Sequence, residues 1–183
     1  MMDVVFPRNN EKEFIELAKT LGFDELVFFY SSMADFYHST SNIKIHNALL
    51  CGEKKVQKDF FCFVRNPEDA RFVFEKSGPY CVFDLELQVK DFIYHRGSGF
   101  NHVMARFAAE KGVHVGFSFR SVLDASAVQR AQIIGRLKQN IRLCRKYKVK
   151  TIVASFAQSP FEMRSPHDLA NFFTVLGMHP KEA

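Results

Sequence analysis

Residues 151–178, TIVASFAQSPFEMRSPHDLANFFTVLGM, constrain the fold most strongly, because they join a strand, a loop and a helix within one short segment. The first seven of these residues form a mostly apolar run that is too short for a helix, which is typical of a strand buried on both faces. Ser165, Pro166 and Asp168 then supply an N-cap, a proline at the first helical position and an acid in the first turn. The helix is expected to end before Gly177. This order is the repeating unit of parallel α/β folds.

The same order of a short apolar run and a capped helix recurs along the rest of the chain. Strands are expected at 3–6, 25–30, 80–87 and 113–120, and helices at 10–21, 66–76, 100–111 and 126–147. The runs 42–51 and 59–64 fit either a hairpin or two successive barrel strands. The sequence therefore predicts an α/β fold with about seven strands. We expect a TIM-barrel-like βα barrel, with a doubly wound sheet as the alternative, in a single domain over residues 1–183.

The overall charge favours an anionic partner. The formal net charge is +5 and the isoelectric point is about 9.0, which suits nucleic acid but also suits an acidic protein surface. No apolar run reaches the roughly 18 residues that span a membrane, and the N-terminus lacks the apolar region of a signal peptide. We therefore expect a cytoplasmic protein without a membrane partner.

The cysteines predict neither a disulfide framework nor a metal site. Cys51, Cys62, Cys81 and Cys144 are widely spaced and form no CxxC pair. In a cytoplasmic protein such residues are expected to be reduced and to pack in the core.

Three loops that follow predicted strands each carry an arginine. These are HRGSG with Arg96, FRSVLD with Arg120 and FEMRSP with Arg164. In parallel βα folds such loops gather at one end of the sheet, so the three guanidinium groups are expected at one barrel mouth. The arginine fork suits phosphate, which predicts an anion or RNA-backbone site. Alternatively, each arginine pairs with a carboxylate such as Glu162 or Asp168.

The alternation in GFSFR orients the side chains around this mouth. Gly116, Ser118 and Arg120 are expected on one face of the strand, with Phe117 and Phe119 on the other, against helices. The polar residues expected at the mouth besides the arginines are His95, Asn101, Ser118 and Ser155.

The longest predicted helix carries both an apolar stripe and many cations. The apolar stripe consists of Ile133, Ile134, Leu137, Ile141 and Cys144. The cations expected opposite that stripe are Arg136, Lys138, Arg142 and Lys146. Such a face is either simply solvated or an electrostatic footprint for RNA. Arg130 is expected on the apolar side of the first turn, where it either reaches the barrel mouth or lies along the core.

The sequence contains no established catalytic or cofactor-binding pattern. Asp84 and Glu86 are two apart on a predicted strand and would share a face, as paired catalytic carboxylates or metal ligands do. The seven histidines, however, form no HxH or HExxH spacing, and neither a nucleophile elbow nor a phosphate-binding glycine loop is present. We therefore predict no catalytic residue, no metal and no cofactor.

Several segments together resemble one family. They are DVVFPRN near the N-terminus, HRGSGFNHV, GFSFRSVLD and the long run QRAQIIGRLKQNIRLCRKYKVKTIVASFAQSPFEMRSPHDLANFFTVLGM. From about Tyr94 to Met178 the chain is similar to ribonuclease P protein component 3, the archaeal relative of the eukaryotic thirty-kilodalton ribonuclease P subunit. The resemblance implies a barrel related to the metal-dependent phosphoesterases of the polymerase and histidinol phosphatase type. Members of the family usually continue beyond the LGM segment, so that the barrel here is expected to be incomplete or shortened at its C-terminal end.

The resemblance also implies a role and partners. It implies a subunit of the ribonucleoprotein ribonuclease P, in which RNA removes the 5′ leader from precursor tRNA. The implied partners are ribonuclease P RNA, the small ferredoxin-like protein component 2, with which a heterotetramer could form, and precursor tRNA indirectly. DVVF stands where the phosphoesterases carry an HxH strand, which agrees with a non-catalytic role. Two alternatives stay open: a metal-dependent phosphoesterase that uses Asp84, Glu86 and His95, and an assembly scaffold that binds an acidic protein.

Overall fold

Seven parallel strands form one sheet in the order of the sequence. The computed structural model describes residues 1–38, 42–56, 61–87, 91 and 96–182. The strands are β1 (Met2–Val5), β2 (Glu25–Tyr30), β3 (Lys44–Leu50), β4 (Cys62–Arg65), β5 (Cys81–Phe83), β6 (His114–Ser118) and β7 (Thr151–Ala154). Because β3 and β4 pair in parallel, the strands that the sequence predicts near 42–51 and 59–64 are successive barrel strands and not a hairpin.

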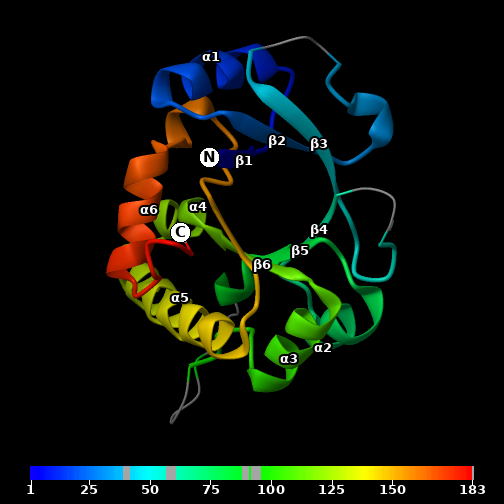
Figure 1. Cartoon of the computed structure of the whole chain (residues 1–183), viewed down its shortest axis with the longest axis vertical. Coiled ribbons are helices and arrows are strands. Elements are labelled where there is room, and N and C mark those ends of the chain that lie inside the picture. Colours follow the sequence, from blue (N-terminus) through cyan, green and yellow to red (C-terminus); the bar gives the residue numbers. More distant parts are fainter. Residues whose placement is uncertain (39–41, 57–60, 88–90, 92–95, 183) are drawn as a thin grey trace.

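The sheet curls until its first and last strands meet. Val5 bridges Ala157, just beyond β7, and the amide of Phe6 donates a 2.8 Å hydrogen bond to the Ala157 carbonyl. This nearly closes the ring of strands in Figure 1 and confirms the TIM-barrel-like prediction.

The helices cover the outer side of the strands (Figure 1). The longer ones are α1 (Glu11–Leu21), α3 (His102–Lys111), α5 (Ala127–Tyr147) and α6 (Pro166–Val175). Shorter helical segments are η1 (Met33–Asp35), α2 (Ala70–Phe72), the π-helix η2 (Val73–Ser77), η3 (Leu85–Leu87), α4 (Phe119–Leu123) and η4 (Pro160–Glu162). Two predicted caps are present: the Ser165 hydroxyl accepts the Asp168 amide at the start of α6, and Ser126 and Gln129 form a capping box for α5. The capping box that the sequence predicts at Asn10 is absent, because the Asn10 side chain makes no cap hydrogen bond to α1.

Alternation along the strands divides the core into two layers. On β2, for example, Leu26 and Phe28 face the helices, whereas Val27 and Phe29 face the barrel interior. The interior is filled largely by phenylalanine rings, and those of Phe83 and Phe156 stack with centroids 4.6 Å apart. Part of the chain's 21 phenylalanines thus fills the barrel where aliphatic residues usually do.

Three strands end at least two residues earlier than the sequence predicts. The run 151–157 is a strand only as far as Ala154. The expected strand 80–87 stops at Phe83, because Asp84 takes a left-handed backbone conformation with φ of 59° and η3 follows. Asp84 and Glu86 therefore do not share a strand face. The expected strand 113–120 stops at Ser118, and Arg120 lies in the first turn of α4 instead.

The expectation of four reduced cysteines is wrong for one pair. Cys51 and Cys62 form a disulfide, with Cα atoms 5.8 Å apart. Their proximity follows from the parallel register of β3 and β4, which places Leu49 opposite Cys62. Cys81 and Cys144 are free and buried, as predicted. Within the described ranges, no helix is both long and apolar enough to cross a membrane.

Candidate functional site

A pocket of about 360 Å³ opens at the carboxyl ends of the strands. Arg65 ends β4, Asp84 follows β5, and Ser118 ends β6; all three line the pocket. Its helical side is formed by α4 and α5, and its floor by the aromatic residues of the barrel interior. This is the barrel mouth where the sequence places a binding site.

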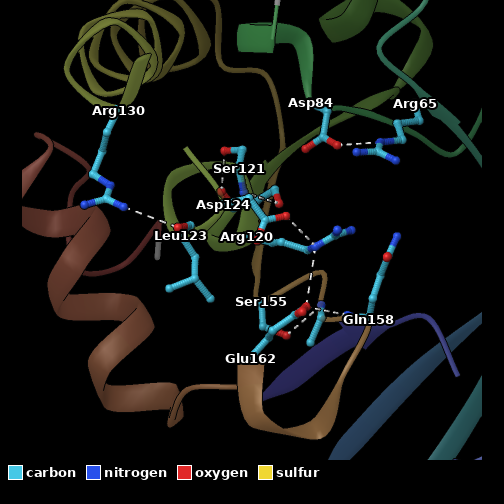
Figure 2. Close-up of polar contacts among 12 residues, drawn as sticks. Arg65, Asp84, Arg120, Ser121, Leu123, Asp124, Arg130, Ser155, Gln158 and Glu162 are labelled. Atoms are coloured by element: carbon cyan, nitrogen blue, oxygen red, sulfur yellow. Dashed lines mark hydrogen bonds and ion pairs between the residues drawn. The ribbon is translucent and has the colours of Figure 1, made fainter. Parts of the chain in front are cut away.

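Asp84 is the most deeply buried acid of the mouth. Its Oδ2 accepts a 2.7 Å hydrogen bond from Nε of Arg65, and the side chain of Asp84 is 5% exposed (Figure 2). Its other oxygen, Oδ1, is buried and has no hydrogen-bond partner among the described residues. Burial raises the pKa of Asp84, and the neighbouring Arg65 guanidinium opposes that rise.

Arg120 lies between two carboxylates (Figure 2). Its Nε is 2.9 Å from Asp124 and 3.4 Å from Glu162. Of the two interpretations open from the sequence, pairing with a carboxylate thus holds for Arg120, and Glu162 is one partner. Asp168 is engaged elsewhere, since it accepts a hydrogen bond from the Ser165 hydroxyl.

Arg136 is buried, and the prediction that it lies opposite the apolar stripe of α5 is wrong. It follows Ile133 by three residues, and that spacing places both side chains on the inner face of the helix. Its Nε donates to Asp91 at 2.8 Å, and its Nη1 donates to the Glu86 carbonyl at 3.0 Å. These bonds turn Arg136 into part of the pocket wall.

Glu86 lies behind this wall with its carboxyl group removed from water. Ser121 donates a 2.8 Å hydrogen bond to Glu86 Oε1. Burial, reinforced by the charge of Asp84, raises the pKa of Glu86 to about 8. The Glu86 carboxyl group is therefore mainly protonated at neutral pH.

The remaining predicted arginines make structural contacts outside the pocket. Arg96 is exposed and donates to the carbonyl of Gly135 on α5 at 3.3 Å. Arg164 donates to the Met163 carbonyl and lies over the ring of Phe119. Neither lines the mouth, so the structure does not bring Arg96, Arg120 and Arg164 together.

Arg130 does not reach the mouth either. Its Nε donates to the carbonyl of Val122 at 2.9 Å, and its Nη2 donates to Ala125 at 2.8 Å. It thereby ties the first turn of α5 to the end of α4, as Figure 2 shows for the contact with Leu123.

Of the polar residues predicted for the mouth, one lines the pocket and two lie elsewhere. Ser118 lines the pocket and its hydroxyl accepts the Ser121 amide. Asn101 caps α3 away from the pocket, and Ser155 is buried against Asp3. His95 lies outside the described residues.

Sequence reasoning missed Arg65. The residue directly follows the predicted strand 59–64, so the rule that places sites at the carboxyl ends of strands could have found it. Because that run fitted a hairpin equally well, its end could not be assigned to the mouth.

A second candidate site is the outer face of α5. Lys138, Arg142 and Lys146 are exposed at intervals of four residues, which aligns them along one side of the helix. None of them forms an ion pair within the part of the chain that the structure describes. The neighbouring Arg145, by contrast, is paired with Glu182 at 2.9 Å. We call Lys138, Arg142 and Lys146 the basic row.

The carboxylates at the mouth are poorly placed to bind a metal ion. Oδ2 of Asp84 is occupied by Arg65, and Glu86 is protonated and bonded to Ser121. Among the described residues, no three His, Cys, Asp or Glu side chains are grouped as metal ligands would be.

Comparison with known proteins gives consistent matches. The family model described as RNase P subunit p30 matches residues 88–183. Ribonuclease P protein component 3 of Methanosarcina acetivorans is 38% identical over 90 residues, which cover 49% of this chain and 38% of that protein. The protein of the same name from Thermococcus kodakarensis is 39% identical over 85 residues, covering 46% of this chain and 39% of the relative. The matched segments thus span well under two thirds of these relatives.

The whole chain also matches a solved structure. A chain in the cryo-EM structure of archaeal ribonuclease P with mature tRNA superposes with a TM-score of 0.81. The match covers 100% of this chain and 86% of the other, at 20% sequence identity. At this identity the match supports the fold, including the half of the barrel that the family model does not reach.

Proposed function

The chain belongs to the RNase P subunit p30 family, and from this premise we propose that it is a protein subunit of ribonuclease P. In this role it binds the catalytic RNA and supports RNA-catalysed removal of the 5′ leader from precursor tRNA. It does not cleave RNA itself, and it contacts precursor tRNA indirectly. The names of the relatives and of the archaeal complex support this assignment.

The basic row on α5 is the observation that carries RNA binding. Lys138, Arg142 and Lys146 are exposed and lie within the segment that the family model matches. Cations without carboxylate partners can neutralise phosphates and release counterions, which is the main source of affinity for nucleic acid backbones. A paired cation such as Arg145 would first have to break its ion pair with Glu182.

The proposal includes the partners that the family resemblance implies. The RNA is ribonuclease P RNA, and the protein partner is protein component 2, together with which the chain forms a heterotetramer. The complex acts in the cytoplasm. Of the predicted RNA-binding residues, we retain Arg96 together with the basic row, because it is exposed and contacts Gly135 of α5. Arg120, Arg130, Arg136 and Arg164 have structural contacts that argue against a place on the surface that binds the backbone of ribonuclease P RNA.

A metal-dependent phosphoesterase is not favoured. That function would need Asp84 and Glu86 as ligands, but Asp84 is paired with Arg65 and Glu86 is protonated at neutral pH. An assembly scaffold that binds only an acidic protein would leave the basic row without a role in RNA binding.

Reconstitution of precursor-tRNA cleavage tests the proposal. Catalytic RNA and the other protein subunits are assayed with and without this chain, and we expect faster cleavage at limiting magnesium with it. A variant with Lys138, Arg142 and Lys146 changed to Gln should lose most of the gain. The matched control changes Lys12, Lys19 and Lys54, which are exposed elsewhere, to Gln. Equal cleavage with and without the chain would refute the proposed function.

A further inference from the structure

Two arginines of the mouth pocket have unused hydrogen-bond donors. Arg65 and Arg120 both line the pocket; Nε of Arg65 donates to Asp84 at 2.7 Å, and Nε of Arg120 is 2.9 Å from Asp124 without forming a hydrogen bond to it. Among the described residues, their terminal nitrogens Nη1 and Nη2 have no hydrogen-bond partner. Figure 2 shows both side chains in the same site as Asp84. The terminal edges of two guanidinium groups suit the oxygens of a phosphate.

The same pocket contains an acceptor that lacks a donor. Asp84 is 3% exposed and its Oδ1 has no hydrogen-bond partner in the described part of the chain. A buried polar atom without a partner is costly, and such atoms in native proteins commonly mark the place of a ligand or water. Inorganic phosphate alone does not fit this arrangement well, because its charge would face the Asp84 carboxylate. A fitting ligand combines an anionic group with an N–H or O–H donor.

The size and the lining residues of the pocket further limit which ligands fit it. A volume of about 360 Å³ lies at the lower end of the range of small-molecule sites, roughly 300 to 1,000 Å³. The half-buried Phe6 lines one side of the pocket, and the buried residues Phe83 and Phe156 line it too. Gln129 and Gln132 of α5 add amide groups that can both donate and accept. An aromatic face beside amides suits a nucleobase.

We propose that the mouth pocket binds a single nucleotide. Arg65 and Arg120 hold its phosphate, Asp84 Oδ1 accepts a hydrogen bond from a ribose hydroxyl or base amine, and Phe6 contacts the base. The nucleotide is either a free nucleoside monophosphate or an unpaired residue of an RNA strand. The proposal does not depend on a role in ribonuclease P, because every residue that it uses belongs to this chain.

Titration of the wild-type chain followed by NMR tests the proposal without a mutation. Nucleoside 5′-monophosphates are added, and we expect saturable shifts of the backbone amide signals of Ser118, Ser121 and Gln132. The matching nucleosides and inorganic phosphate should each bind at least tenfold more weakly. A short single-stranded oligoribonucleotide separates the two sources. Shifts at the pocket with the oligonucleotide alone assign the site to RNA, and shifts with the monophosphates assign it to the free nucleotide.

Two variants test the role of the arginines. Arg120→Met should raise the Kd for the bound nucleotide at least tenfold, whereas Arg164→Met, on a neighbouring loop outside the pocket, should leave it unchanged. If Arg120→Met does not fold, Gln132→Ala is used instead, with an expected several-fold rise. The proposal is wrong if neither monophosphates nor the oligonucleotide shift the pocket signals. It is also wrong if inorganic phosphate binds equally well, or if Arg120→Met folds and binds normally.

Discussion

Asp3 and Ser155 join the two ends of the barrel, although 152 residues separate them in the chain. Oδ1 of Asp3 accepts the Ser155 amide at 2.6 Å, and Oδ2 accepts the Ser155 hydroxyl at 2.7 Å. Asp3 is fully buried, and burial raises its pKa to about 6. The join between β1 and the segment after β7, which we call the seam, has an isolated bridge between Val5 and Ala157. The hydrogen bonds between Asp3 and Ser155 strengthen this join.

Ser155→Ala should destabilise this seam. The change removes the hydroxyl that donates to Asp3 Oδ2 and leaves that oxygen buried without its partner. We expect the free energy of unfolding to fall by about 1 to 3 kcal/mol in urea denaturation. Ser31→Ala, at an exposed serine, serves as the control and should change it by less than about 0.5 kcal/mol. Equal stability of the two variants would show that the seam does not depend on Ser155.

Gly116→Ala should also destabilise the chain, through crowding of the barrel interior. A Cβ atom at this position would lie 2.8 Å from Cβ of Phe83 and 3.2 Å from the ring of Phe156. Because Phe83 is held by the sheet and by stacking on Phe156, relief requires backbone movement. We expect a loss of about 1 to 3 kcal/mol in the same assay. Gly52→Ala meets no atom within 4 Å and should be nearly neutral; a similar loss there would contradict the argument.

The sequence predicted the barrel well, because local patterns repeat in it. Apolar runs and helix caps such as Ser165 depend only on neighbouring residues, so the order of the elements could be read directly. Contacts of single cations could not be read in this way. The helical pattern places Arg136 opposite the apolar stripe, yet Asp91 and the Glu86 carbonyl stabilise it inside. These two partners of Arg136 lie 45 and 50 residues away in the sequence, so the helix pattern alone does not show them.

The stability of the chain should depend on the protonation of Glu86. Its pKa is raised from 4.5 to about 8 in the folded chain, so the folded state binds more protons than the unfolded state between these values. The free energy of unfolding should therefore fall as the pH rises from 4.5 to about 8, by at most ~1.4 kcal/mol per pH unit.

Glu86→Gln isolates this effect, because glutamine keeps the shape and cannot ionise. The difference in unfolding free energy between variant and wild type should grow in favour of the variant over this pH range and level off above it. Denaturant titrations of both proteins at a series of pH values measure this difference in unfolding free energy. A difference that does not vary with pH would mean that Glu86 titrates normally.

The disulfide between Cys51 and Cys62 should be detectable and stabilising. It closes a short loop, with a sequence separation of 11, across the neighbouring strands β3 and β4. Reduction should lower the free energy of unfolding by about 2 to 3 kcal/mol. Chain purified in air and denatured without reductant should expose only the thiols of Cys81 and Cys144 to alkylation. Mass spectrometry counts the labels, and four labels on the unreduced chain would show that the bond does not form.

The basic row should determine how RNA binding responds to salt. Each of Lys138, Arg142 and Lys146 that contacts a phosphate releases counterions, so changing it to Gln should reduce the slope of log Kobs against log salt by about 0.7 to 0.9. The control is Arg145→Gln on the same helix, where the guanidinium is already paired with Glu182 and should contribute less. Filter binding or fluorescence anisotropy with ribonuclease P RNA between about 50 and 200 mM salt measures the slopes. If the three variants match the wild type while Arg145→Gln does not, the RNA contacts lie elsewhere on the barrel.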